Sequence, residues 1–209
     1  MYLPAHFTMS DADAVDAARA RGFGTLVVAG VAGLEASPLP FVVDADEAGI
    51  RVRAHVAKAN PIVAALPAAA ALLAVELADA YVSPGWYRSK AEHQRVVPTW
   101  NYVAVHLHGT ARTVADTEWL RLLVNELTER HEATMAAPWS VADAPDDYLD
   151  AMLRAIVGVE VRVDRVEGKA KLSQNRPAAD ALGAVAGLRA VGRDDMADRM
   201  VVEIEEGDA

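Results

Sequence analysis

Three apolar runs near the start of the chain are joined by short connections. The runs are Phe23 to Ala29, Leu34 to Val43 and Ile50 to Ala57, and the segments GVAG and DADEAG separate them. Glycine and aspartate in connections this short favour β-hairpins, because parallel strands need crossovers of a dozen or more residues. The sequence therefore predicts an antiparallel sheet.

Other patterns predict further strands and flanking helices. Three more strands are expected at Ala71 to Leu77, Thr99 to Val114 and Ile156 to Gly168. Helices are expected from Asp11 to Arg21 between Ser10 and Gly22, after Asn60 with Pro61 in first position, from Asp116 to about His131, near Pro145 to Arg154, and from Ala178 to about Arg189. The predicted fold class is α+β, mainly β, with six antiparallel strands and flanking helices.

The chain is long enough to bury one full core. Its 209 residues are 53% hydrophobic, and the sequence contains no internal repeat and no interdomain linker. We expect one domain over residues 1–190, followed by a C-terminal helix and acidic tail over residues 191–209. The final segment, EIEEGDA, is strongly acidic and is expected to fray.

The charge balance disfavours direct nucleic-acid binding. The chain has 30 acidic and 20 basic residues, a net charge of −10, whereas affinity for DNA comes mainly from Lys and Arg that neutralise phosphates. It has no cysteine, which excludes thiolate catalysis, cysteine-based zinc sites and disulfides. The sequence shows no signal peptide and no apolar run long enough to span a membrane. We therefore expect a cytoplasmic protein that does not associate with membranes.

Three motifs resemble known sites but fail in their context. The GFG at 22–24 leads into a predicted strand, whereas a dinucleotide-binding loop leads into a helix. The HEATM at 131–135 lacks the second histidine of a zinc-protease helix. His106 and His108 share one face of a strand, but two imidazoles are half a zinc site, and polar side chains on an exposed strand face are the commoner case. No metal site is expected.

The segment KAKLSQNRP, residues 169–177, combines an unusual number of hydrogen-bonding groups. Lys171 and Arg176 can neutralise a phosphate or a ring oxyanion, and the hydroxyl and amides at 173–175 can bind a flat heterocycle. The segment is therefore a candidate ligand site. A solvated strand-to-helix connection, with Pro177 opening the next helix, is an equally good interpretation.

Two other polar clusters follow predicted strands. In HVAKANP, Lys58 and the start of a helix at Asn60 can face one anion, although Lys58 can equally be a solvated side chain. In PTWNY, Trp100 can stack on a planar ring and Asn101 can bind a carbonyl and a ring nitrogen together. Packing of Trp100 in the core is the alternative.

Taken in order, several segments resemble the PaiB family, described as FMN-binding negative transcriptional regulators. The segments are MYLPAHF, GLEASPLPFVVD, HVAKANP, AYVSPGWY, SKAEHQRVVPTWNYVAVHLHG, PWSVADAP and KAKLSQNRP. The resemblance extends from Met1 to about Arg189. It implies the FMN-binding split-barrel fold of pyridoxamine 5′-phosphate oxidase-like proteins, in which a six-stranded antiparallel barrel forms a homodimer and flavin lies in a groove between subunits.

The resemblance also implies a set of cofactor-binding residues. The phosphate would be held near the end of the third strand by His55, Lys58 and Asn60, and the ring would lie along the second strand, where Ser37 and Leu39 offer backbone groups. The polar edge of the ring would meet Thr99, Trp100 and Asn101. The groove would be closed by Lys171, Ser173 and Asn175, from the same or the partner subunit. Ala170 stands where an aromatic residue is expected, so one stacking contact is missing.

The resemblance implies an FMN-binding protein that acts as a negative transcriptional regulator, directly or indirectly. The sequence shows no helix-turn-helix, and its acidity favours an indirect effect. A flavin-dependent oxidoreductase acting on a small molecule is the alternative, because a fold that binds flavin can host several functions. A structural homodimer whose flavin groove has decayed is a third hypothesis. The residues identify no catalytic group.

Overall fold

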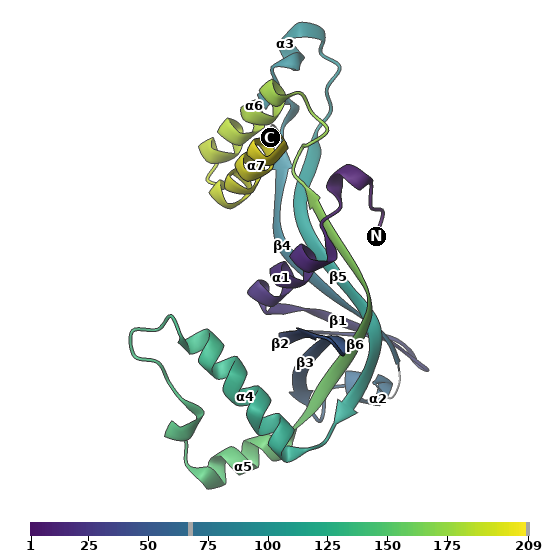
Figure 1. Ribbon diagram of the computed structural model, residues 1–209, viewed down its shortest axis with the longest axis vertical. Helices are drawn as coiled ribbons and strands as arrows, with labels where there is room; N and C mark the ends of the chain where they lie inside the picture. Colours follow the sequence, from purple (N-terminus) through teal and green to yellow (C-terminus); the bar gives the residue numbers. More distant parts are fainter. Residues whose placement is uncertain (67–68, 208–209) are drawn as a thin grey trace. The chain divides into compact units, whose positions relative to one another are not determined.

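The computed structural model describes residues 1–66 and 69–207. Two compact units divide the chain (Figure 1). Unit 1 comprises Met1–Ala17, Glu76–Val105 and Glu167–Ala209, and unit 2 comprises Ala18–Val75 and His106–Val166. Each unit is therefore assembled from segments that are distant in sequence. In the part of the chain that is described, no helix is long and apolar enough to cross a bilayer.

The six strands pair in the order β1-β2-β3-β6-β5-β4, and the order closes on itself because β1 also pairs with β4. Their bounds are β1 Phe23–Gly30, β2 Gly33–Asp46, β3 Gly49–Ala57, β4 Ala69–Val82, β5 Thr99–Val114 and β6 Ile156–Lys171. The predicted antiparallel pairing is confirmed: β1 with β2, and β2 with β3, form two tight hairpins. Gly33 and Gly49 have φ of +123° and +111°, which other residues rarely adopt.

Unit 2 contains the hairpins and the parts of β4, β5 and β6 that pair with them. Side chains alternate along these strands between buried and exposed positions, as a barrel with one packed face requires. Among those with almost no exposed surface are Leu26, Val28, Phe41, Leu73, Val75 and Leu107. The apolar runs that predicted the strands therefore supply the core of unit 2.

Helices cover the outside of the sheet in unit 2. They are α2 Ile62–Ala65, α4 Thr117–Glu132 and α5 Asp146–Ala155, with a short 3-10 helix, η3 Val141–Asp143, between α4 and α5. The predicted N-cap of α4 is confirmed, since the Asp116 carboxylate accepts from Trp119 N at 2.9 Å. Arg53 of β3 joins α4 to the sheet, because it binds Asp44 through two hydrogen bonds and Glu126 of α4 at 2.7 Å.

Unit 1 packs helices against the remaining parts of β4, β5 and β6. The helices are η1 Ala5–Phe7, the start of α1 Asp11–Arg21, η2 Pro84–Trp86, α3 Ser89–His93, α6 Ala178–Ala190 and α7 Asp194–Gly207. The predicted N-cap of α1 is confirmed by a bond of 3.1 Å from Asp13 N to Ser10 Oγ. Trp86 lies against two glycines of α6; a Cβ at Gly187 would stand 2.1 Å from its indole.

The structure corrects three boundary predictions. The acidic C-terminus is not a frayed tail: α7 extends to Gly207 because Met196, Ala197 and Met200 of this helix are fully buried, while residues 208–209 lie outside the described part. The last strand does not stop at Gly168 but runs to Lys171. The helix after Asn60 has only four residues, and Pro61 is its N-cap rather than its first residue.

Candidate functional site

The turn after β6 uses much of its hydrogen-bonding capacity to hold itself together. Gln174 Oε1 accepts from Leu172 N at 2.8 Å, and Gln174 Nε2 donates to the Ala170 carbonyl at 2.7 Å. Ser173 has a φ of 71°, the left-handed conformation that a tight turn requires. Gln174 therefore serves the turn rather than a heterocycle. For Gln174, a structural role in the connection between the strand and the next helix is therefore the better interpretation.

Asn101 and Ser173 form a buried pair in unit 1. Asn101 Nδ2 donates to Ser173 Oγ at 3.0 Å and also lies 3.3 Å from the sulfur of Met200. Both side chains are almost completely shielded from solvent. The pair joins β5 to the turn, and burying two polar groups this way costs little because each satisfies the other. The two side chains therefore fix the backbone of β5 to the backbone of the turn after β6.

Lys171, the last residue of β6, lies next to a polar side chain of β5. Its Nζ donates to Thr99 Oγ1 at 2.5 Å. The pKa of Lys171 lies below its ordinary value, chiefly because burial removes water from the ammonium, and Lys169 and Arg176 add repulsion. Such a group gains from a bound anion, which would favour its charged form.

Two more cations belong to this cluster. The Lys169 ammonium is buried, donates to the Tyr2 carbonyl at 2.9 Å and lies 5.1 Å from the Tyr102 ring centre. The Arg176 guanidinium lies 4.7 Å from the Tyr87 ring centre. Within the described residues, none of the three cations has a carboxylate at ion-pair distance. The end of β6 is therefore positively charged in a chain of net charge −10.

Trp100 lies on the surface rather than in the core. Its side chain is 53% exposed, and its ring meets the Tyr81 ring edge-on at 6.3 Å between centroids. The core-packing alternative for Trp100 is wrong. An exposed aromatic face on β5, near Thr99 and its lysine partner, can stack on a planar ligand. Asn175 is also exposed, in the turn itself.

The predicted phosphate residues lie in unit 2. Asn60 Nδ2 donates to Ser37 Oγ at 3.0 Å, and Asn60 Oδ1 accepts from Ile62 N at 3.0 Å. The first N–H of the four-residue α2 is thus already bound, and the side chains of Ser37 and Leu39 are buried. Lys58 is exposed just beyond β3. Among the predicted phosphate-binding residues, Lys58 therefore supplies the positive charge.

His55 of β3 has an unusual environment. Its Nδ1 is buried and has no hydrogen-bond partner among the described residues. Burial lowers the pKa of this imidazole, which favours the neutral form. Across the sheet it pairs with Gly158 of β6, which adds no side chain. An unsatisfied buried nitrogen is costly, so a hydrogen-bond partner from a ligand or water would stabilise it.

Sequence reasoning missed the residues that fix the excursion between β4 and β5. Asp180 of α6 is buried and binds the backbone and hydroxyl of Ser89, and the buried Tyr87 hydroxyl has no hydrogen-bond partner among the described residues. One signal was available: Asp180 is the only acidic residue in the apolar helix AADALGAVAGLRA. Buried acids are rare unless they are paired, so this position indicated a partner.

Residues 1–165 match the family model described as "Putative FMN-binding domain". The chain belongs to this FMN-binding domain family. FMN is accordingly the cofactor that membership of this family indicates. The chain is 29% identical over 194 residues to protease synthase and sporulation protein PAI 2 of Bacillus subtilis, covering 90% of this chain and 89% of the relative. It is 32% identical over 195 residues to an uncharacterized protein of Emericella nidulans, covering 77% of each. The resemblance to the PaiB family is confirmed.

Solved structures share the fold of this FMN-binding family member. A conserved hypothetical protein of Mycobacterium tuberculosis has a TM-score of 0.57 at 18% identity, covering 85% of this chain and 94% of that one. The FAD and heme binding protein of Mycobacterium smegmatis has a TM-score of 0.54 at 18% identity, covering 85% and 78%. The predicted split-barrel fold with flanking helices is confirmed.

The donor set of each unit fits FMN. Unit 1 offers an exposed indole, Trp100, together with Lys171, a cation that has no carboxylate at ion-pair distance among the described residues. Unit 2 offers the exposed Lys58 and the orphaned Nδ1 of His55. A flavin phosphate needs cations, and a flavin ring needs a flat apolar surface with hydrogen-bond donors at its edge. Both requirements have candidate residues.

Proposed function

We propose that the protein is a cytoplasmic FMN-binding homodimer that acts as a negative regulator of gene expression without contacting DNA itself. Membership of the FMN-binding domain family supports flavin binding. The name of the Bacillus subtilis relative associates that protein with protease synthesis and sporulation, which supports a role in controlling a cellular programme. A redox-active cofactor in such a protein would couple that control to metabolism.

The observation that carries the flavin assignment is the pair Lys171 and Thr99 next to Trp100. A partly buried ammonium, held at 2.5 Å by a hydroxyl, is oriented before any ligand arrives. It would bind the electronegative edge of the ring while the Trp100 indole covers the ring's face. Bound flavin would supply reversible electron uptake, and Lys171 would stabilise negative charge that gathers at the ring's edge.

The remaining predicted residues take roles that their environments permit. His55, Lys58 and Asn60 would hold the phosphate, with Lys58 as the charge and the neutral His55 imidazole donating Nδ1–H to a phosphate oxygen. Ser37 and Leu39 would contribute backbone groups only, because their side chains are buried. The buried Asn101 and Ser173 would position the turn, and the exposed Asn175 would reach the ligand directly.

An exposed apolar surface supports the homodimer. Three apolar side chains of unit 1 are about half exposed or more: Tyr81 on β4, Val97 just before β5 and Trp100 on β5. Aromatic residues are enriched at subunit interfaces, and a two-fold axis would pair this surface with itself. Completion of a flavin groove by a partner subunit would also make cofactor binding depend on assembly.

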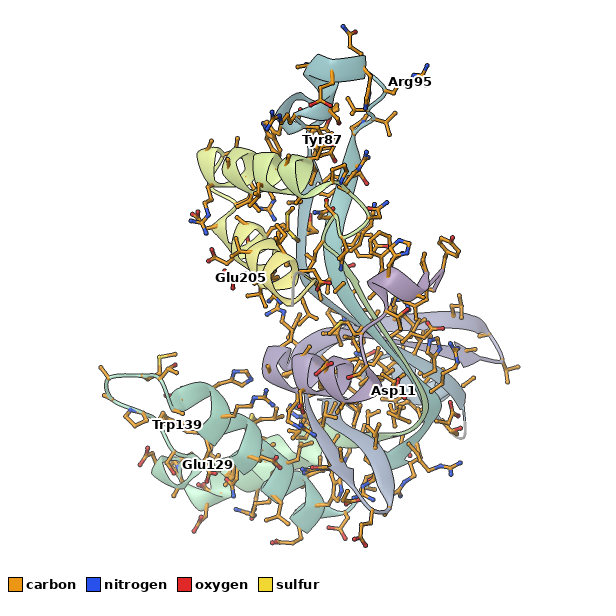
Figure 2. The ribbon with its side chains drawn as sticks, turned by 45° about the horizontal axis from the view of Figure 1, so that its top comes forward. Asp11, Tyr87, Arg95, Glu129, Trp139 and Glu205 are labelled. Atoms are coloured by element: carbon orange, nitrogen blue, oxygen red, sulfur yellow. The ribbon has the colours of Figure 1, made fainter. Side chains whose placement is uncertain are left out.

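The charge distribution supports indirect regulation. Arg88, Lys90 and Arg95 cluster in the excursion between β4 and β5, where Figure 2 labels Tyr87 and Arg95. Arg88 already faces Glu92 at 3.8 Å, so the cluster is short and partly neutralised. Duplex binding needs a longer basic face that releases counterions.

Purification of the protein, followed by absorbance spectroscopy and assays for NAD(P)H oxidation, tests this function. The purified protein should show a flavin spectrum and oxidise NAD(P)H no faster than free FMN does. Deletion of the gene should raise transcript levels of a defined set of genes, and a variant that cannot bind flavin should not restore repression. Rapid NAD(P)H oxidation together with unchanged transcripts would favour the oxidoreductase alternative instead.

A further inference from the structure

Unit 1 contains a cavity that the flavin assignment does not use. Its volume is about 230 Å³, and it lies between the turn after β6, the start of α6 and the end of α7. The helix α7 and this turn both fall outside residues 1–165, the range matched by the family model.

Opposite charges line this cavity without pairing. Arg176 stands on the turn and Glu203 on α7, and within the described residues neither has an oppositely charged partner at ion-pair distance. Each side chain is only partly exposed. Arg176 already lies over the Tyr87 ring and is close enough to Asp180 to help lower the pKa of that carboxyl, whereas Glu203 has no ion-pair partner among the described residues. A counter-charge in the cavity would therefore stabilise Glu203 most, and an anion would add to the partners of Arg176.

The rest of the lining favours the same kind of ligand. Leu172, Ala181 and Ile204 provide an apolar wall, and Ala178, the first residue of α6, brings the positive end of a 13-residue helix to the cavity. Ser173 contributes little polarity, since its hydroxyl is bonded to Asn101. An anionic group would therefore lie by Arg176 and the helix start, and a cationic group by Glu203.

A second cavity, of about 340 Å³, shares Gln174 and Glu203 with the first. His6, Thr8, Ser10 and Asp13 line it, with no lysine or arginine. A cationic group at Glu203 would thus meet further oxygen acceptors and no competing positive charge.

We propose that this cavity binds a small zwitterion, a molecule with one carboxylate, one ammonium and a short aliphatic side chain, as in an aliphatic α-amino acid. The carboxylate binds Arg176 and the start of α6, the ammonium binds Glu203, and the side chain packs on Leu172 and Ile204. The site is independent of the flavin. It gives the protein a means to sense a metabolite.

Isothermal titration of the full-length protein with L-leucine, L-isoleucine, L-valine and L-methionine, with and without saturating FMN, tests the proposal. At least one should bind below about 10 mM with and without FMN. Two single-charge analogues, 4-methylpentanoate and 3-methylbutylamine, should bind at least about tenfold more weakly than leucine, because each leaves one charge of the cavity unpaired.

Substitutions locate the site. Arg176→Gln and Glu203→Gln should each weaken the amino acid about tenfold or more. Glu205→Gln, an exposed change on α7 outside the lining (labelled in Figure 2), should leave binding unchanged. Circular dichroism checks that each variant folds, and the analogues test the proposal in the unmodified protein. The proposal is overturned if no amino acid binds, if an analogue binds as well as the zwitterion, if FMN competes, or if both lining variants bind normally.

Discussion

The Asp180 carboxylate accepts two hydrogen bonds from Ser89, a residue 91 positions earlier: one from its backbone N–H at 2.9 Å and one from its hydroxyl at 2.6 Å. This contact fixes the excursion between β4 and β5 to the first turn of α6. Asp180 is almost fully buried, so the contact is shielded from solvent. It therefore contributes to the stability of unit 1.

Asp180→Ala should lower the free energy of unfolding by about 2–3 kcal/mol, because the buried donors of Ser89 lose a charged acceptor. Urea denaturation followed by circular dichroism measures this change. The control, Asp198→Ala, removes an exposed ion pair with Arg189 and should cost less than about 1 kcal/mol. Equal effects of the two substitutions would mean that the Ser89 contact is unimportant.

The stabilising effect of Asp180 should depend on pH. Burial alone would raise the pKa of this carboxyl, but the hydrogen bonds from Ser89 outweigh it and hold the pKa below the ordinary value of 3.8. A carboxyl with a depressed folded-state pKa stabilises the fold above its unfolded pKa, and this contribution is lost as the pH falls through the folded value. The stability difference between wild type and Asp180→Asn should be constant near neutral pH and shrink below about pH 4. A difference that grows on acidification would refute this sign.

Gly187→Ala should destabilise the protein although alanine favours helices. The added Cβ would stand 2.1 Å from the Trp86 indole, and overpacking of this kind costs about 1–3 kcal/mol. In a Trp86→Ala background the same substitution should be neutral or stabilising by up to about 1 kcal/mol. Thermal denaturation of the four proteins gives the coupling. No coupling between the two positions would show that Trp86 does not pack on this helix.

Lys58→Ala should weaken FMN by ~1–3 kcal/mol and leave riboflavin almost unchanged, because riboflavin lacks the phosphate assigned to this lysine. Lys171→Met should instead weaken both ligands, since the ring's edge is common to them. Lys90→Ala, an exposed lysine on α3, is the matched control. Titrations monitored by flavin fluorescence separate the cases. Equal losses of both ligands in Lys58→Ala would move the phosphate to another cation.

Duplex DNA from the region upstream of the gene should not bind more tightly than about micromolar at physiological salt. The reason is the net charge of −10 and the short basic cluster around Arg88, Lys90 and Arg95. Fluorescence anisotropy, with and without FMN, is the measurement. A sequence-dependent, salt-sensitive complex at nanomolar protein would show that this cluster recognises an operator.

Much of the fold follows from local patterns. Thr99–Val114 was predicted to the residue, because its alternation and the proline before it are both visible in the sequence. A C-terminal helix was predicted, but its extent to Gly207 was missed, because the acidic composition of the last residues suggested a tail. Met196 and Met200, one turn apart, are the positions that bury this helix.

The candidate site was only partly predictable, for a physical reason. Which polar groups remain available depends on bonds that form only in the folded chain. Gln174 is consumed by its own turn, and Asn101 by Ser173, whereas Trp100 turned outward and Lys171 kept only a hydroxyl partner. The two units were also invisible in the sequence, since each combines distant segments.

The most direct measurement is the stoichiometry and affinity of FMN for the purified protein by isothermal titration calorimetry. The account predicts one FMN per subunit with affinity at or below micromolar, and, in sedimentation equilibrium, a dimer whose subunits share the groove. No detectable heat at micromolar protein and flavin would contradict the central claim, and a monomer that still binds FMN would contradict the shared groove.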